Sequence, residues 1–574
     1  MPENSDKKEL IVDILLKILK KKKIKITSEE ILKKIAIPPT AELGDFAFPC
    51  FFLGPLLKEE PADIAEELRE DIMKFKGIKD VQTQGPYINF FVDRKKLTED
   101  IISEIISKKE KFGSSNLGKG KKIMVEFSQA NTHKAFHVGH IRGTSIGESL
   151  ARIFEFCGNK VIRANYQGDS GMHVAKWIWC YKKYHSKEKL KEDESWVASI
   201  YVDAVQRLEK NKNLQAEVDM VNQKLETGED KELMELWKNT RAISLKSLEK
   251  IYSQLNTHFD TYYFEKDIEK RGKEIVDFIL KKGIAKKSEG AVIMDLQKYN
   301  LGVWVLIRKD GTALYSTKDL ALVEKKFSQY PDLEEAIYVI ANEQNLHFNQ
   351  LAKTLELIKS KSADKIKHVS FGVVRLPEGK MSSRTGQNIL YSDFLEKIVS
   401  HAKKEIKKRY PKIKADKLNE RALKISIASI KYSMLKQGEQ KDIIFDIKEA
   451  LNFEGNSGPY IQYSYARASS ILKKAKNKTE GDVDFEQLED KETELIKKMS
   501  EFGDVVQRAY ETLNPSDIAN YTYQLAQIFN EFYHSCPVIG SEEKESFRIS
   551  LVESFRQILK NSLYLLGIDV LEEM

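Results

Sequence analysis

The stretch Phe127–Gly147 reads FSQANTHKAFHVGHIRGTSIG, and it decides the fold. An apolar run, Ile123–Val125, precedes it, and apolar residues at helical spacing continue from Ile146 to Cys157. Gly158 is a natural helix stop, and the residues after it, 161–166, have the composition of a second strand. The sequence therefore predicts a strand–loop–helix–strand unit, which is typical of a parallel α/β sheet.

Two histidines, His137 and His140, stand three residues apart where this helix is expected to begin. Residues three apart share one face of a helix, and the first turn offers free backbone N–H groups and the positive end of the dipole. Gly139 lies between them and lets a flat or anionic ligand come close. The HxGH pattern is short, however, and a histidine pair is more often structural or solvated than catalytic. The surrounding residues must therefore decide between a nucleotide site and a structural pair.

Glu126, Asn131 and Lys134, together with HVGH at 137–140, resemble the ATP-binding signature of class I aminoacyl-tRNA synthetases. The wider pattern resembles the arginyl-tRNA synthetase family. A second signature, KMSSR at 380–384, resembles the KMSKS loop of the same class and follows about one Rossmann domain later. The resemblance implies catalytic roles for Lys134, His137, His140 and Lys380, and ATP binding by His137, Gly139, His140, Lys380, Met381, Ser382, Ser383 and Arg384.

The resemblance also implies a two-step ligase reaction. The carboxylate of arginine attacks the α-phosphorus of ATP, pyrophosphate leaves, and a terminal ribose hydroxyl of tRNA(Arg) then takes the arginine. The first step needs reactants held in line and charge neutralised on the leaving phosphates. We expect Mg²⁺ to arrive with ATP and not to be held in a protein cage.

One position departs from the class pattern. Class I enzymes usually carry a second lysine in the KMSKS loop, and this chain has Ser383 there. A positive charge on the leaving pyrophosphate is then missing. Lys134, three residues before His137, is the first candidate to replace it, and Arg384 is the second because a guanidinium is permanently charged.

Selection of arginine requires a carboxylate for the guanidinium. The segment 310–319, DGTALYSTKD, resembles the arginine pocket of the family, and Tyr315 and Asp319 would share a helix face. The resemblance assigns the guanidinium to Tyr315 and Asp319, the α-amino and carboxylate end to Glu126 and Asn131, and a lining role to Gln344, whose alignment within 342–344 could shift by one. The run Asn165, Tyr166, Gly168, Asp169 and Gly171 resembles an NxxGDxG loop near the adenylate, although a plain loop turn competes for Asp169.

The length of 574 residues requires several domains. We expect an N-terminal α+β domain at 1–112 that contacts the tRNA D-loop, then a Rossmann-type catalytic domain at 113–395 with a helical insertion at about 182–260. The sheet should resume with strands at 292–294 and 303–306. A helical stem-contact segment at 396–452 and an all-α anticodon-binding domain at 453–574 should follow.

Two sets of aromatic and polar residues in the terminal domains have expected roles. In the first domain Tyr87 and Asn89 match D-loop-reading positions, although Tyr87 could equally pack against a strand. In the last domain we interpret Tyr460, Tyr463 and Tyr465 as core residues.

The composition constrains the binding partners and the cellular compartment of the protein. The net charge of +7 is compatible with RNA binding but does not demand it. Cys50, Cys157, Cys180 and Cys536 are scattered, so we expect no disulfide framework, no zinc and a reducing cytoplasm. No stretch predicts a membrane span, the N-terminus does not resemble a signal peptide, and we expect a monomer whose partners are tRNA(Arg), ATP and L-arginine.

Three functions remain in competition at this stage. An arginyl-tRNA synthetase explains both signatures and the long helical C-terminal part. Another superfamily member is possible, but a cysteinyl enzyme needs a zinc site and a small nucleotidyltransferase needs no such helical domain. A catalytically inactive tRNA-binding relative is disfavoured by the intact HVGH and KMSSR and slightly favoured by Ser383.

Overall fold

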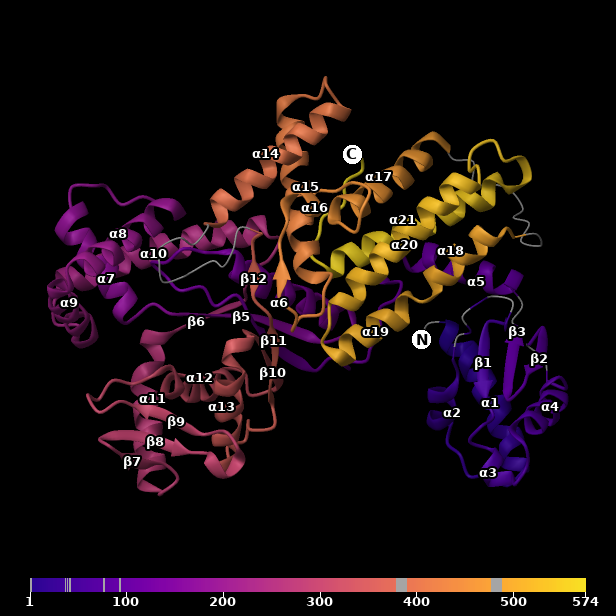
Figure 1. Cartoon of the computed structure of the whole chain (residues 1–574), viewed down its shortest axis with the longest axis horizontal. Coiled ribbons are helices and arrows are strands. Elements are labelled where there is room, and N and C mark those ends of the chain that lie inside the picture. The colour runs from indigo at the N-terminus through magenta and orange to yellow at the C-terminus, as the bar shows by residue number, and fades with distance from the viewer. Residues whose placement is uncertain are drawn as a thin grey trace. The chain divides into compact units, whose positions relative to one another are not determined.

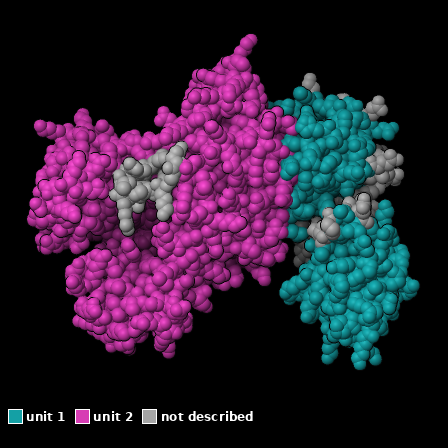
Figure 2. Space-filling view, in the orientation of Figure 1, with its two compact units in different colours: residues 1–113, 468–504, 527–559 teal, residues 114–467, 505–526, 560–574 magenta. Residues whose placement is uncertain are grey.

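The computed structural model describes residues 3–36, 38, 40, 43–75, 78–91, 94–377, 390–475 and 488–574. The chain forms two compact units, coloured teal and magenta in Figure 2. Unit 1 consists of residues 1–113, 468–504 and 527–559, and unit 2 of residues 114–467, 505–526 and 560–574. Each unit is therefore built from three separate segments, and the segments alternate along the chain.

The N-terminal part of unit 1 is an α+β layer structure (Figure 1). Its antiparallel sheet has the order β1-β3-β2, with β1 at Phe46–Pro49, β2 at Asp80–Gln84 and β3 at Tyr87–Phe91. One apolar core joins the sheet to the surrounding helices, whose buried residues include Leu15 and Leu68. The helices of this part are α1 (Glu3–Lys21), α2 (Ser28–Lys34), α3 (Gly54–Leu57), α4 (Pro61–Ile72) and α5 (Arg94–Lys108).

Unit 2 is built on a five-stranded, fully parallel sheet, which confirms the predicted fold class. The strand order is β11-β10-β4-β5-β6, with β4 at Lys122–Glu126, β5 at Lys160–Gln167, β6 at Thr261–Phe264, β10 at Leu333–Ala341 and β11 at Ile366–Phe371. The chain runs outward from β4 in one direction and later from β10 in the other. The switch point of this topology therefore lies between β4 and β10, and ligands of doubly wound folds bind at such a point.

Helix α6 (Val138–Phe156) connects β4 to β5 and is buried along nearly its whole length. It packs against β4, β5 and β10, and also against α15 (Ala415–Leu435). Two of its glycines permit this close packing. A Cβ at Gly147 would lie 2.1 Å from the ring of Phe127, and a Cβ at Gly143 would lie 3.0 Å from the ring of Phe371.

The predicted strands at 292–294 and 303–306 exist, but their assignment to the parallel sheet is wrong. They are β8 (Ala291–Asp295) and β9 (Val303–Ile307), and with β7 (Lys286–Ser288) they form a separate antiparallel sheet. This sheet shares an apolar core with α11 (Glu265–Lys281) and α12 (Tyr315–Gln329). The parallel sheet resumes instead with β10 and β11.

A helical subdomain follows β5 in the chain and has its own core, which includes Trp177, Trp196 and Trp237. Its helices are α7 (Met172–Cys180), α8 (Glu194–Lys210), α9 (Gln215–Thr227) and α10 (Lys231–Gln254), and a π-helical turn at Tyr181–His185 follows α7. Chain 345–475 adds α13 (Asn345–Leu357), α14 (Tyr391–Arg409), α15, α16 (Ile447–Ala450), α17 (Gly458–Ala475) and the short parallel pair β12 (Val374–Arg375) and β13 (Ile443–Ile444).

The described residues of the C-terminal part contain helices and no strand. It contains α18 (Asp490–Ser500), α19 (Phe502–Thr512), α20 (Ser516–Ser535) and α21 (Glu545–Leu565). Helices α17, α19, α20 and α21 each contribute residues to both units. Within the described ranges, no helix combines the length and the apolar character that a membrane span needs.

We expect Gly147→Ala to destabilise unit 2. Alanine favours a helix over glycine by about 1 kcal/mol, but the new methyl group would overlap Phe127, which is fully buried at the end of β4. Overpacking of this kind typically costs about 1–3 kcal/mol, so the net change should be a loss. All five tryptophans lie in unit 2, so urea unfolding followed by tryptophan fluorescence measures this unit.

Gly438→Ala is the matched control, because nothing lies within 4 Å of a Cβ built there. Its urea midpoint should stay close to that of the parent chain. A Gly147→Ala variant as stable as the control would show that the helix and strand can separate to admit a methyl group.

Candidate active site

The two histidines of HVGH lie at the first turn of α6, close to the switch point of the sheet. His137 is the N-cap residue, with extended backbone, and its N–H donates to Nδ1 of His140 over 3.1 Å. The two imidazole rings stack with centroids 3.9 Å apart. Because Nδ1 of His140 accepts, its Nε2 carries the proton and can donate to a ligand. His137 also forms a β-bridge with Leu390, the first described residue after the segment 378–389.

Both imidazoles are held neutral. Burial, followed by the positive charge of Lys134, lowers the pKa of His137 to about 4. Burial, His137 and Lys134 hold the pKa of His140 well below its usual range. Near pH 7 the pair therefore presents N–H donors without adding positive charge, beside the backbone N–H groups of the helix start.

Lys134 lies beside the histidine pair and is partly buried. Its ammonium is 5.6 Å from the ring centroid of Tyr201, and burial and Lys176 lower its pKa. Among the described residues it forms no ion pair. The structure thus places an uncompensated ammonium next to the first turn of α6, as expected if it attracts an anionic ligand.

Asn131 and the loop after β5 are in direct contact. Thr132 donates both its backbone N–H and its hydroxyl to the carbonyl of Gly168. A Cβ at Gly168 would lie 2.2 Å from Oδ1 of Asn131, so only glycine permits this approach. Asp169, whose role was open, is fully buried; it pairs with Arg241 at 3.1 Å and accepts from the backbone of Lys266 at 3.0 Å. These contacts fix the position of the loop after β5, so Asp169 has a structural role here.

Glu126 ends β4 in a buried ion pair. Its carboxylate lies 2.5 Å from the ammonium of Lys326, which is fully buried on α12 and stands 3.9 Å from the ring centroid of Tyr338. The other oxygen accepts from Gln129 at 3.0 Å. The negative charge of Glu126 is therefore already balanced by a residue of the chain.

Asp319 and Tyr315 lie on the same helix, α12, as predicted, and His347 on α13 joins them. Nε2 of His347 is 2.6 Å from Oδ2 of Asp319, and its ring lies 6.1 Å from that of Tyr315. The indole of Trp304 donates to Nδ1 of His347 over 3.2 Å. An indole N–H can only donate, so Nδ1 accepts and the proton of His347 resides on Nε2, where it donates to Asp319. A neutral histidine then orients the Asp319 carboxylate, which pairs with no lysine or arginine among the described residues.

The buried hydroxyl of Tyr166 lies within the electrostatic influence of Asp319 and Glu265. Burial, followed by the carboxylates of Asp319 and Glu265, holds its pKa well above the usual range. Its buried hydroxyl has no hydrogen-bond partner among the described residues, and neither has that of Tyr338. Glu265 in turn pairs with Lys318 at 2.9 Å. Polar atoms without partners, beside one unbalanced carboxylate, indicate room for a polar cationic ligand.

The remaining predicted residues are more dispersed. Gln344 is exposed, ends a short 3₁₀ turn and precedes α13. On β3, Tyr87 is 41% exposed, whereas Asn89 is buried between its neighbours on β1 and β2. The second signature lies outside the described residues; it comprises Lys380, Met381, Ser382, Ser383 and Arg384.

Arg142 is an important residue that the sequence analysis did not single out. It is fully buried on α6, and its Nη1 donates to the carbonyls of Gly372 and Lys441, each over 2.7 Å. Its Nη2 donates to the carbonyl of Glu439 over 2.9 Å. The residue ties the helix of the histidine pair to the chain after β11 and to the loop 438–441. The available signal was an arginine two residues beyond HVGH, within the predicted helix.

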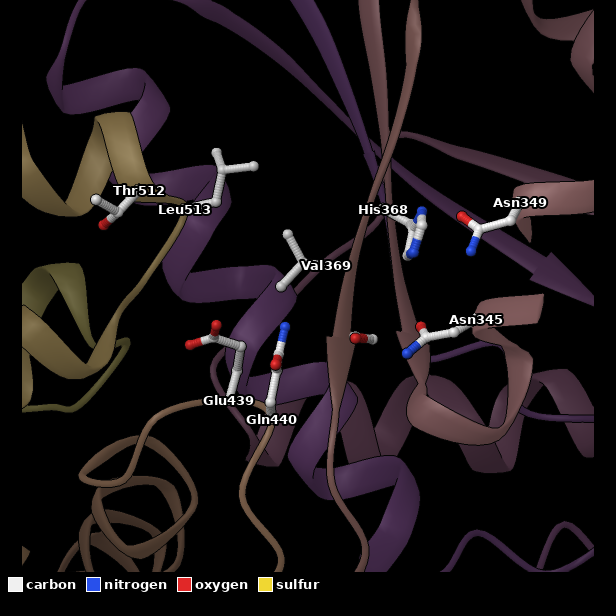
Figure 3. A pocket seen from close by; sticks show the side chains of 9 residues that line it. Asn345, Asn349, His368, Val369, Glu439, Gln440, Thr512 and Leu513 are labelled. Carbon is white, nitrogen blue, oxygen red and sulfur yellow. The ribbon is translucent and has the colours of Figure 1, made fainter. Parts of the chain in front are cut away.

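The loop that Arg142 holds also borders a polar pocket of about 290 Å³ at the outer strand β11. Figure 3 shows Asn345, Asn349 and His368 on one side of the strand and Glu439 and Gln440 on the other. None of the residues predicted from the sequence lines this pocket. The predicted histidine pair lies instead at the start of α6, and Tyr315 and Asp319 lie on α12.

Comparisons with known proteins match three parts of the chain. Residues 101–447 match the family model described as tRNA synthetases class I (R), catalytic domain; residues 8–92 match the arginyl tRNA synthetase N terminal domain, and residues 461–574 the DALR anticodon binding domain. The parallel sheet and the histidine pair at α6 thus belong to a class I aminoacyl-tRNA synthetase.

Individual relatives show which family within this class the chain resembles. The chain is 38% identical to the arginine–tRNA ligase of Clostridium perfringens, covering 96% of this chain and 98% of the relative, and 38% identical to that of Clostridium acetobutylicum, covering 99% and 100%. The solved arginyl-tRNA synthetase of Thermus thermophilus superposes with a TM-score of 0.81 at 26% identity, covering 99% of this chain and 100% of that one. The chain belongs to the arginyl-tRNA synthetase family, and its activity is the ATP-dependent ligation of arginine to tRNA.

The buried histidines predict a loss of stability in acid. Burial lowers the pKa of His133 to about 3 and that of His137 to about 4, and holds that of His173 well below 6.5. An unfolded histidine is protonated near pH 6.5, so below that pH the unfolded state binds more protons than the folded state. The free energy of unfolding should therefore fall as the pH falls from 6.5 toward 4.

The measurement is the urea midpoint at pH 7 and at pH 5. Carboxylates contribute to any such drop, so the comparison is between variants. His173→Gln should show a smaller drop than the parent chain, while His258→Gln, at an exposed site, should match the parent. Equal drops in all three proteins would contradict the assignment of neutral buried histidines.

Proposed function

We propose that the first turn of α6 binds the triphosphate of ATP and that Lys134, His137 and His140 stabilise the leaving pyrophosphate. The observation that supports this most is the stacked, neutral histidine pair with an unpaired lysine beside it at a helix start. Neutral imidazoles donate hydrogen bonds, the ammonium supplies charge, and Gly139 leaves the helix face open. Mg²⁺ accompanies the phosphates, and Lys380 and the rest of KMSSR complete the ATP site.

In the amino-acid pocket, the guanidinium of arginine pairs with Asp319. Of the two carboxylates predicted to contact the substrate, Glu126 forms an ion pair with Lys326, whereas Asp319 accepts from His347 and pairs with no lysine or arginine among the described residues. The unbalanced carboxylate therefore selects a cationic side chain, and His347 positions it. Tyr315 covers the guanidinium, and Glu126 and Asn131 serve the α-amino and carboxylate end. Gln344 lines the same pocket.

The tRNA contacts are proposals of the same kind. Tyr87, exposed at the start of β3, is suited to contact the D-loop, and Asn89 supports the strand from within the sheet. Residues 396–452 contact the stem and residues 453–574 the anticodon. The enzyme acts as a cytoplasmic monomer on tRNA(Arg).

Asp319→Asn should raise the arginine KM far more than the ATP KM. The substitution keeps the shape and the bond to His347 but removes the charge, which leaves a guanidinium without its counter-charge. A loss of about 3 kcal/mol corresponds to more than a hundredfold in arginine use. The measurement is pyrophosphate exchange with saturating tRNA, with each substrate varied in turn. Asp332→Asn, at an exposed carboxylate that pairs with Lys122, is the control; equal changes in both KM values would make Asp319 a structural residue.

Lys134→Ala should lower kcat by about a hundredfold or more and change the arginine KM less, because its charge acts mainly on the leaving phosphates. Ser383→Lys should restore part of the activity in the Lys134→Ala background, since either position can supply the missing ammonium. Lys182→Ala removes an exposed lysine paired with Glu232 and serves as the control.

Two results would change this assignment. Normal turnover of Lys134→Ala would make Arg384 the replacement for the loop lysine. A crippled Lys134→Ala without recovery from Ser383→Lys would mean that Lys134 is needed for another reason.

A further inference from the structure

Three side chains with metal-binding atoms meet at the end of α7, in the helical subdomain of unit 2. The thiol of Cys180 lies 3.3 Å from Oδ2 of Asp203, and Nε2 of His185 lies 3.0 Å from the same oxygen. The ligand atoms of all three residues fall within 4.8 Å of one another. Cys180 is fully buried, while the side chains of His185 and Asp203 are 22% and 28% exposed. A small ion can therefore reach the group from solvent.

The π-helical turn at Tyr181–His185 brings the first two residues together. In an α-helix, residues five apart point about 140° away from each other around the axis. In the π turn the hydrogen bonds run from residue i to i+5, so residues five apart lie nearly above one another. Asp203 then arrives from α8, which packs against α7 in the tryptophan-rich core. The absence of zinc was predicted from scattered cysteines and from the lack of a Cys/His cluster in the sequence, and neither signal can reveal an arrangement made by a π turn and by helix packing.

Other residues orient these three side chains. Nδ1 of His185 lies 2.6 Å from a carboxylate oxygen of Glu188, so Nε2 is turned toward Cys180 and Asp203. The indole of Trp196 donates to the other oxygen of Glu188 over 2.9 Å. A histidine that binds a metal usually has a carboxylate on its second nitrogen in this way. Arg207 donates to Asp203 over 2.7 Å, and a carboxylate has enough lone pairs to accept this bond and bind a metal.

We propose that Cys180, His185 and Asp203 bind a zinc ion that fastens α7 to α8. Sulfur, imidazole nitrogen and carboxylate oxygen are the donors that zinc prefers, and three protein ligands leave the fourth tetrahedral position to water. With the usual zinc–ligand bond lengths, tetrahedral ligand atoms lie roughly 3.3–3.6 Å apart. The separations of 3.0 and 3.3 Å need to open by only a few tenths of an ångström. The thiol proton leaves to solvent as the metal binds, and the thiolate and carboxylate balance the ion's charge.

A second group of potential metal ligands differs from the group at Cys180, because nearby cations already balance its negative charges. Glu489, Glu492 and Cys536 also bring their ligand atoms within 4.8 Å. Arg548 is 2.7 Å from Glu492 and also pairs with Glu489, and Lys544 is 3.2 Å from Glu489. Two cations and the absence of a histidine make this group an ion-pair network. The group at Cys180 has a histidine with a carboxylate behind it and one cation on its edge.

The test is the metal content of the full chain. The purified protein is dialysed against metal-free buffer and analysed by elemental mass spectrometry, and we expect close to one zinc per chain. The protein is then stripped, refilled with Co²⁺ and examined by absorption spectroscopy. We expect intense tetrahedral d–d bands and a thiolate-to-cobalt charge-transfer band that reach their full strength at one equivalent. Readouts of this kind do not depend on ligase activity.

Substitutions of single residues test which side chains bind the metal. Cys180→Ser should abolish the charge-transfer band, and His185→Gln should lower the zinc content and weaken cobalt binding at least tenfold. Cys157→Ser and His258→Gln, which alter a cysteine and a histidine outside the group, should keep both signals. Circular dichroism checks that the variants fold, and added zinc should raise the melting temperature of the parent chain but not that of Cys180→Ser.

Absence of stoichiometric zinc, together with a cobalt spectrum that lacks a thiolate band, would overturn the proposal. The three side chains would then be a hydrogen-bonded network. Equal loss of signal in Cys157→Ser would also overturn it, because the metal would then bind elsewhere.

Discussion

The hydrogen bonds of Arg142 are the constraint on which the active site depends. One buried guanidinium donates to carbonyls at Gly372, Glu439 and Lys441, which belong to two segments far apart in the sequence. In the function proposed above, ATP binds between the start of α6 and the segment that carries KMSSR, so the helix and the chain after β11 must keep a fixed relation. The planar fork of an arginine can hold several carbonyls at once, whereas a lysine ammonium offers a single point charge. The interaction therefore joins α6 to the chain after β11 and to the loop 438–441 through backbone carbonyls.

Electrostatics divides the site into two regions of different character. Around α6, burial keeps the imidazoles neutral, and the ammonium of Lys134, which forms no ion pair among the described residues, lies beside them, so this region suits an anion. Around α12, the ion pair of Glu126 with Lys326 cancels one carboxylate, and the neutral His347 leaves Asp319 negative. That region suits a cation. In the proposed assignment, charge alone directs ATP to the first region and arginine to the second, before any complementarity of shape.

The sequence predicted the unit β4–α6–β5 because its signals are local. An apolar run, helical spacing and a glycine stop each lie within a few residues of the element that they define. The signals that predicted the strands at 291–295 and 303–307 were equally local. Their partners in the sheet could not be predicted in this way, because strand composition does not say which sheet a strand joins. His347 was missed for a similar reason: its partner Asp319 lies on a different helix. Arg142 was missed because its partners are backbone carbonyls, which have no sequence signature.

The alternation of the two units along the chain bears on how the protein is made. Unit 2 includes residues 560–574, and its central helix α6 depends on them: Ser149 donates to the carbonyl of Leu565 over 2.8 Å, and Arg152 to that of Tyr564 over 3.0 Å. Asn256 reaches Asp569 over 3.0 Å. During synthesis the sheet and α6 emerge from the ribosome long before these partners exist. The catalytic unit must therefore wait, incompletely packed, until translation has passed through the helical C-terminal part.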